Sequence, residues 1–237
     1  MESISSISKM IDHSLLNPTF TDEFLKAGCV LAREFDTASV CIKPYAVKMA
    51  KEILTGSTVK VCTVIGFPHG SNTVEQKVSE AESLYALGAT EIDFVVNIGK
   101  VLSKEWKYIS DEIKIINDAV TSLGGITKVI FENDYYTEDY YKIKLCELCN
   151  QYKPAFVKTS TGYGFVKQAD GTYNYKGATD HDLKLMRENC LPEIQIKAAG
   201  GVRTLDDLLR VKKLGVTRIG ATATKEIISA AIKLGYK

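Results

Sequence analysis

Two lysines end two apolar, strand-like segments, and their setting suggests amine chemistry. Lys158 ends the segment 155–158 and Lys197 ends the segment 194–197, and small residues follow each of them. A buried ammonium group is costly unless it is paired or gives up its proton. Lys158 therefore has two interpretations, a salt bridge or phosphate contact, and a nucleophilic amine.

The second lysine favours the nucleophile. Adjacent strands lie about 4.8 Å apart, so lysines at equivalent heights on neighbouring strands bring their amines within a few ångströms of each other. Two like charges at such a distance disfavour double protonation. We expect Lys197 to keep its proton and Lys158 to attack a carbonyl as the neutral amine, which is the arrangement that Schiff-base chemistry requires.

Carboxylates also occur in apolar strand-like runs. Asp93 lies in the segment 91–96, and strand alternation places it on one face with Val95 and Asn97. We interpret Asp93 as the counter-ion of a buried lysine, as a proton shuttle, or as both. Asp12 is a similar residue near the start of the chain, and there structural hydrogen bonding and binding of a substrate hydroxyl both remain open.

Two glycine-containing segments have the form of phosphate-binding helix starts. Residues 200–204 and 220–224 each follow an apolar segment and precede a helical pattern. Backbone N–H groups at helix starts bind phosphate, and barrels often place such a site after strands seven and eight. Together with the paired lysines, these segments predict a phosphorylated substrate.

The elements that must position these residues alternate along the chain. Short β-branched runs are each followed by a segment of helical period, which is typical of parallel strands joined by crossover helices. The expected strands centre on residues 10–12, 39–42, 59–64, 91–96, 128–131, 155–158, 194–197 and 218–220. We predict an α/β fold, a (β/α)8 TIM barrel in a single catalytic domain over residues 1–237, with a doubly wound open sheet as the alternative.

Local signals support this division. The apolar stripe over residues 73–87 predicts a helix that ends before Gly88, and residues 205–214 predict another with Thr204 as its N-cap. Residues 165–175 resemble two short strands around an Asp-Gly turn. Such a hairpin, placed after the sixth strand, would project from the face where barrels build their active sites.

Composition excludes several classes of function. The 237 residues contain 30 Lys+Arg and 29 Asp+Glu, so we expect no nucleic-acid or membrane partner. We find no targeting signal and no apolar run of spanning length, and we expect a cytoplasmic protein. The six cysteines predict reduced thiols, and Cys146-x-x-Cys149 lies in a helical pattern without a second ligand pair, so no metal site is expected. We assign no catalytic role to His13, His69 or His181.

The motifs together resemble those of deoxyribose-phosphate aldolase. They are carried by residues 12–16, 61–70, 91–93, V-K-T-S-T-G at 157–162 and K-A-A-G-G-V-R-T at 197–204. The resemblance covers nearly the whole chain in order. It implies a class I aldolase that cleaves 2-deoxy-D-ribose 5-phosphate to acetaldehyde and D-glyceraldehyde 3-phosphate without a metal or organic cofactor.

The resemblance also implies roles for individual residues. Lys158 falls on the Schiff-base lysine, Lys197 on the second active-site lysine and Asp93 on the proton-relay aspartate. We predict substrate contacts from Asp12, Cys41, Thr159, Gly162, Gly200, Gly201, Arg203, Gly220 and Thr222. Thr222 stands where the family's final phosphate loop commonly has serine, so the affinity for phosphate is open.

Two other functions remain as alternatives. A sugar-phosphate isomerase or epimerase on the same barrel would use the glycine loops but would not need paired lysines. A non-catalytic barrel that binds sugar phosphates would form no covalent adduct. The expected partners are a small sugar phosphate and an aldehyde, with a homo-oligomer expected only by analogy with other barrel enzymes.

Overall fold

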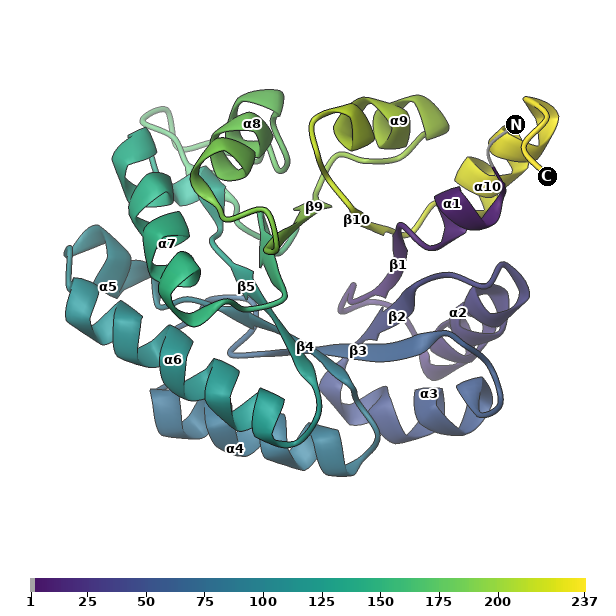
Figure 1. The fold of residues 1–237 in the computed structure, drawn as a ribbon, viewed down its shortest axis with the longest axis horizontal. Coiled ribbons are helices and arrows are strands. Elements are labelled where there is room, and N and C mark those ends of the chain that lie inside the picture. The colour runs from purple at the N-terminus through teal and green to yellow at the C-terminus, as the bar shows by residue number, and fades with distance from the viewer. Residues whose placement is uncertain (1–2) are drawn as a thin grey trace.

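The computed structural model describes residues 3–237, which form a closed barrel of eight parallel strands (Figure 1). Met1 and Glu2, the start of the segment in which we find no targeting signal, lie outside the described residues. The barrel strands are β1 (Ile11–Leu15), β2 (Ser39–Ile42), β3 (Lys60–Ile65), β4 (Glu91–Val95), β5 (Ile126–Ile130), β6 (Phe156–Lys158), β9 (Gln195–Ala199) and β10 (Arg218–Ala221). Around the barrel their order is β1-β10-β9-β6-β5-β4-β3-β2, which rules out the open-sheet alternative.

Helices surround the barrel and cover the outer faces of its strands (Figure 1). They are α1 (Ser5–Ser8), α2 (Asp22–Glu34), α3 (Val47–Leu54), α4 (Val74–Ala86), α5 (Ile98–Leu102), α6 (Trp106–Ser122), α7 (Asp139–Tyr152), α8 (Asp180–Asn189), α9 (Leu205–Lys213) and α10 (Thr224–Lys233), with short 3-10 turns at Pro44–Ala46 and Asn133–Tyr135. The two ends of the chain lie together, since the Ile4 N–H donates to the Lys237 carbonyl at 2.7 Å. No helix within residues 3–237 is long and apolar enough to cross a bilayer.

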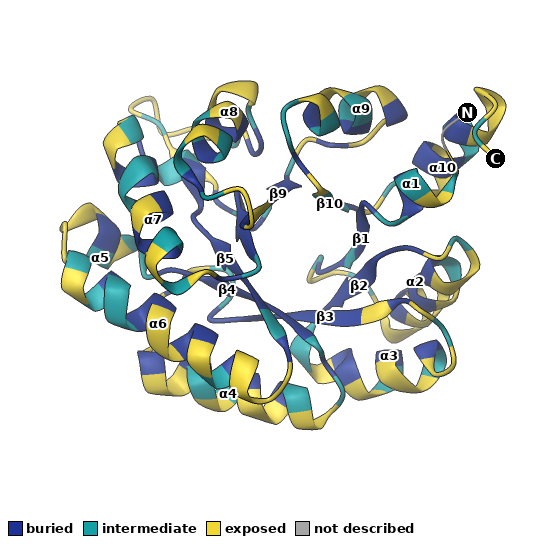
Figure 2. Cartoon of the chain, in the orientation of Figure 1, coloured by how far each residue is buried: buried dark blue, intermediate teal, exposed yellow. Residues whose placement is uncertain are grey.

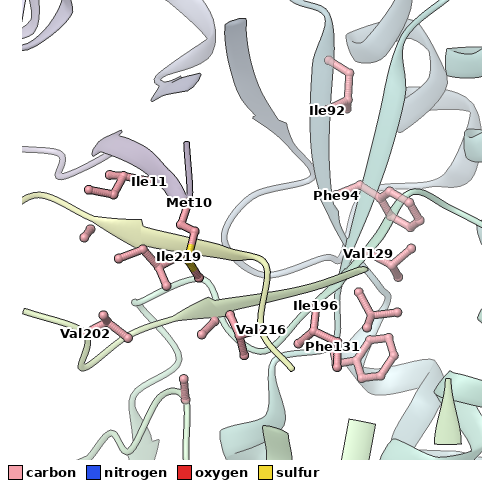
Figure 3. Close-up of a cluster of buried hydrophobic side chains, with 14 of the residues drawn as sticks. Met10, Ile11, Ile92, Phe94, Val129, Phe131, Ile196, Val202, Val216 and Ile219 are labelled. Carbon is pink, nitrogen blue, oxygen red and sulfur yellow. The ribbon is translucent and has the colours of Figure 1, made fainter. Parts of the chain in front are cut away.

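The period-two alternation of the strands sorts apolar from charged side chains. Figure 2 shows the strands buried and the helices exposed only on their outer sides. Ile92, Phe94 and Val129 belong to the buried apolar cluster between strands and helices (Figure 3). Asp93 and Lys128 alternate with them and therefore point into the barrel, where they contact each other. The barrel interior is thus a charged layer inside an apolar shell.

The predicted N-cap of α9 is confirmed at Thr204. Thr204 and, at the start of α4, Thr73 each form a capping box in which side chain and backbone exchange hydrogen bonds. Thr179 caps α8 by accepting from the Asp182 N–H at 3.1 Å. Cys146 lies in α7 as a buried free thiol, and the other five cysteines are also buried and unpaired.

Strand bounds differ from the expected ones by one to three residues at some ends. β1 continues through His13 and Ser14 to Leu15, three residues beyond the expected end at Asp12. The reason is tertiary, because the barrel interior accepts polar side chains wherever a neighbouring strand supplies a partner. Asp12, for example, pairs in register with Ser39 and accepts its hydroxyl hydrogen bond at 2.6 Å.

The predicted hairpin is confirmed. β7 (Val166–Lys167) and β8 (Tyr173–Asn174) form a two-stranded antiparallel sheet between β6 and α8, separate from the barrel. Its turn contains Gly171, which has a positive φ of 84°.

Candidate active site

The two lysines predicted from the sequence lie side by side at the carboxyl ends of β6 and β9. Lys158 pairs directly with Lys197 in the parallel register, so their side chains leave the sheet at the same height. Each Nζ lies 2.8 Å from the same atom, Asp93 Oδ2. The trio proposed from the sequence is therefore brought into one contact, with almost no exposure to solvent.

A third lysine, Lys128 on β5, completes this contact and was not singled out from the sequence. Its Nζ lies 2.7 Å from Asp93 Oδ1, on the other oxygen of the same carboxylate. Cys62 Sγ donates to that oxygen at 3.2 Å. Sequence reasoning could have found Lys128, because it too is a lysine in an apolar strand, and the register places it beside Asp93.

Further charges lie beneath the lysines. Lys128 contacts Glu91 at 2.7 Å, and Lys197 contacts Asp12 at 2.5 Å. Arg218 on β10 donates to Asp12 at 2.6 Å and lies 3.2 Å from Glu91. In the part of the chain that the structure describes, this layer holds three carboxylates, Asp12, Glu91 and Asp93, against four cationic side chains, Lys128, Lys158, Lys197 and Arg218. Three cations suffice for neutrality, so one amine can be uncharged.

Electrostatics identify which groups keep their charges. Burial would raise the pKa of Asp93, but Lys128 and Lys197, together with the charged form of Lys158, outweigh it and hold that pKa well below its usual range. Burial would lower the pKa of Lys197, but Asp12 and Asp93 outweigh it and raise that pKa. The pKa of Lys128 is raised in the same way, because the charge of Asp93 is the largest of the effects that outweigh its burial. These shifts favour the ammonium form of Lys197.

A cavity of about 510 Å³ opens above the lysine pair. Lys158 and Lys197 line it, whereas Asp93 is fully buried beneath them. The cavity contains seven of the predicted substrate-contact residues: Cys41, Gly162, Gly200, Gly201, Arg203, Gly220 and Thr222.

Two predicted substrate contacts are placed elsewhere. Asp12 is fully buried below the lysines, where its oxygens are taken by Lys197, Arg218 and Ser39, so the structural interpretation of Asp12 replaces substrate binding. Thr159 is also fully buried, and its hydroxyl exchanges hydrogen bonds with the backbone of Ala199, at 3.0 Å each. That hydroxyl ties β6 to β9 and faces away from the cavity.

Two helix starts form one end of the cavity. Gly200 and Gly201 have positive φ angles of 87° and 85° and turn the chain from β9 toward α9, while residues 220–223 lead from β10 into α10. Their backbone N–H groups and the helix dipoles favour an anion at this end. The Thr222 hydroxyl donates to the Ser14 carbonyl at 3.1 Å, so this side chain is already engaged.

Glu132 is a second residue that sequence reasoning missed. It has a left-handed backbone, with φ 62°, and is fully buried at the end of β5. Its carboxylate accepts from the Thr161 N–H at 3.0 Å and also from the Thr161 hydroxyl. Burial raises the pKa of Glu132 to about 7 despite those hydrogen bonds. Glu132 thus fixes the loop that follows Lys158.

The histidines lie outside this cavity, as expected. His13 is buried, its Nδ1 is 2.8 Å from the Thr224 hydroxyl, and burial lowers its pKa to about 4. His69 is exposed in the turn after β3. His181 lies on the far side of the hairpin, beside a cavity of about 730 Å³.

Three groups of side chains in the described part of the chain have the composition of metal ligands, but a lysine already lies at each. Lys128 lies 2.7 Å from Glu91 in the group of Asp12, Cys62 and Glu91. Cys62 and Asp93 lie close to Cys41, yet the Lys128 ammonium is 3.1 Å from Cys62 Sγ. The group of Asp139, His181 and Asp182 surrounds Lys142, whose Nζ lies 2.6 Å from Asp182 and 3.1 Å from Asp139. The ammonium groups neutralise these carboxylates and fill the position of a cation.

Comparison with known proteins gives a consistent result. Residues 7–226 match the model of the DeoC/LacD family aldolases. The chain is 48% identical over 227 residues to deoxyribose-phosphate aldolase of Rhodopirellula baltica, covering 96% of this chain and 90% of that protein. It is 44% identical over 226 residues to that of Clostridium perfringens, covering 95% and 96%.

A solved structure extends the likeness to three dimensions. The tetrameric deoxyribose phosphate aldolase of Aeropyrum pernix superposes with a TM-score of 0.85 at 26% identity, covering 98% of this chain and 93% of that one. With its closed barrel, its paired strand-end lysines and a family match over nearly its whole length, the chain belongs to the DeoC/LacD family of aldolases.

Proposed function

We propose that this barrel domain is a class I aldolase that cleaves 2-deoxy-D-ribose 5-phosphate reversibly to acetaldehyde and D-glyceraldehyde 3-phosphate. The observation that carries the proposal is the pair Lys158 and Lys197, which share one oxygen of Asp93 at the floor of a cavity with an anion-binding end. An isomerase or a non-catalytic binding protein would not need this arrangement.

The first half of the reaction builds an electron sink. Neutral Lys158 Nζ attacks C1 of the open-chain aldehyde, and the new C–N bond gives a carbinolamine. Its hydroxyl leaves as water after protonation, which produces an iminium ion. Lys197 remains a cation at this site and disfavours a second charge on Lys158 before the attack, so the free amine persists until substrate arrives.

The second half breaks the carbon–carbon bond. The C3 hydroxyl loses its proton, the C2–C3 electron pair moves into the iminium group, and D-glyceraldehyde 3-phosphate leaves an enamine on Lys158. Protonation at C2 and hydrolysis then release acetaldehyde and restore the amine. Because the pKa of Asp93 is low, we assign the proton transfers to a water molecule held by Asp93 and Lys197.

The phosphate of the substrate would occupy the end formed by Gly200, Gly201 and residues 220–223. That placement lets the helix starts bind the anion while C1 reaches Lys158. We also propose a cytoplasmic setting, because six unpaired thiols suit a reducing compartment. A homo-oligomer is proposed as well, by analogy with the tetramer of the Aeropyrum pernix relative.

Borohydride trapping tests the proposal. Incubation with acetaldehyde and borohydride, followed by peptide mass spectrometry, is expected to give an ethyl adduct on Lys158. Lys158→Ala should abolish the adduct and the cleavage of 2-deoxyribose 5-phosphate. Lys142→Met, which removes a different buried lysine, serves as the control and should form the ethyl adduct on Lys158 as the wild type does. A wild-type protein that forms no adduct on Lys158 is not a Schiff-base aldolase.

A further inference from the structure

The two residues that flank the β7–β8 hairpin, residues 166–174, contribute to the wall of the active-site cavity. Phe165 and Tyr175 both line the cavity, and their ring centroids lie 5.7 Å apart. Tyr173, by contrast, is 62% exposed on the second strand of the hairpin. The chain at the end of the hairpin therefore places Tyr175 at the site and Tyr173 in solvent.

The chain after Tyr175 is held firmly against the loop that follows β9. The Lys176 and Gly177 N–H groups donate to the Asp134 carboxylate at 2.6 and 3.0 Å. The Ala178 N–H donates to the Gly200 carbonyl at 3.1 Å. Gly177 has a φ of 68°, and a Cβ on it would lie 2.8 Å from the Gly200 oxygen, so this approach is open to glycine alone.

These contacts place the Tyr175 hydroxyl directly on Gly200. A Cβ added to Gly200 would lie 1.8 Å from Tyr175 Oη, and one added to Gly162 would lie 3.9 Å from it. The hydroxyl is buried, yet it has no hydrogen-bond partner among the residues that the structure describes. The Ser160 hydroxyl is a neighbour that lowers the pKa of Tyr175, and it too is buried without a geometrically satisfied hydrogen bond.

A buried hydroxyl without a partner is unfavourable, and one that lines a binding cavity is explained by a ligand that completes it. The neighbouring wall of the cavity leads into the N-terminus of α9 and favours binding of an anion. It is formed by Gly200, Gly201 and Arg203. Burial raises the pKa of Tyr175, so its hydroxyl keeps the proton and can donate. The missing partner is thus an acceptor, and an anionic oxygen is the strongest acceptor that this end of the cavity would hold.

We propose that the Tyr175 hydroxyl, held at the cavity by the contacts of residues 176–178, donates a hydrogen bond to the phosphate of the substrate and gives the enzyme part of its preference for phosphorylated sugars. This inference rests on the proposed function. It makes Tyr175 a specificity-determining residue, and Asp134 the residue that positions it.

Tyr175→Phe tests the inference because it removes one hydroxyl and keeps the ring. We expect kcat/KM for 2-deoxyribose 5-phosphate to fall at least about tenfold, through KM, because the lost hydrogen bond is to a charged group. The value for unphosphorylated 2-deoxyribose should change by less than about twofold. Tyr173→Phe removes the exposed hydroxyl of the same hairpin and should leave both values unchanged.

Binding of inorganic phosphate gives a readout that does not depend on turnover. Calorimetry should show a Kd for inorganic phosphate that is about tenfold higher in Tyr175→Phe than in the wild type and in Tyr173→Phe. Asp134→Ala should also raise the Kd for inorganic phosphate, because it releases the chain that follows Tyr175.

Two results would overturn the inference. One is an equal loss of kcat/KM on both sugars, and the other is unchanged phosphate binding by Tyr175→Phe. Failure of the proposed function itself is separate, since a wild-type protein that forms no borohydride adduct would fail at the first step. The role of Tyr175 alone would be refuted by two results together. The wild type would form the adduct, and Tyr175→Phe would keep the wild-type preference for the phosphorylated sugar.

Discussion

Lys128→Met tests whether the charge count of the barrel interior keeps Lys158 reactive. In the wild type, Lys128, Lys197 and Arg218 match three buried carboxylates, so Lys158 can be neutral. Removing Lys128 leaves three carboxylates with two fixed cations. The variant can then restore neutrality by protonating Lys158, which keeps the fold but removes the nucleophile.

The size of the effect follows from the geometry. Lys128 and Lys158 contact opposite oxygens of Asp93, at 2.7 and 2.8 Å. Their nitrogens are then about 6 Å apart, and at an effective dielectric constant of about 20 their repulsion is about 3 kcal/mol. Losing that repulsion favours the charged form of Lys158 by about a hundredfold. We expect kcat/KM near neutral pH to fall by a similar factor.

The assay is the rate of borohydride-trapped adduct formation with acetaldehyde, measured from about pH 6 to about pH 10. The deficit of Lys128→Met should narrow as pH rises, because alkali removes the proton that the variant gains. Lys142→Met, a buried lysine outside the cavity, is the matched control and should follow the wild-type profile. A folded Lys128→Met protein with a deficit of the same size at every pH would refute the reasoning, since Lys128 would then act by position alone.

Three further predictions concern stability. Glu132 has a folded-state pKa of about 7 against an ordinary 4.5, so the folded protein binds the extra proton and loses stability as pH rises between these values. Glu132→Gln should remove that loss. In urea denaturation, the free energy of unfolding of the variant minus that of the wild type should increase by up to about 3 kcal/mol from pH 4 to above pH 7. Gly70→Ala places a Cβ 2.1 Å from the Val96 carbonyl at a φ of 68°, so we expect at least about 2 kcal/mol of destabilisation, and an unchanged melting temperature would contradict it. Thr73→Ala removes the capping box of α4 and should cost about 1 kcal/mol in chemical denaturation, while Thr19→Ala, in a loop, serves as its control.

The barrel and its central lysine pair could be predicted from local patterns in the chain. Strand and helix periods depend on local alternation, so the order of elements, the cap at Thr204 and the hairpin near residues 165–175 could be predicted. Lys158 and Lys197 could be paired because lysines at the ends of consecutive barrel strands in the chain reach the same height.

The way in which the buried charges pair depends on the folded barrel. Lys128 and Arg218 converge on the carboxylates from strands far apart in the sequence, and the local pattern does not show which carboxylate each cation meets. Asp12 belongs to that layer and not to the substrate cavity for the same reason. The placement of the Tyr175 hydroxyl on Gly200 depends on contacts from Asp134, more than forty residues away. Such contacts form when the barrel closes. Residue spacing along the chain indicates on which face of a strand a side chain lies, but not which side chain of another strand it contacts.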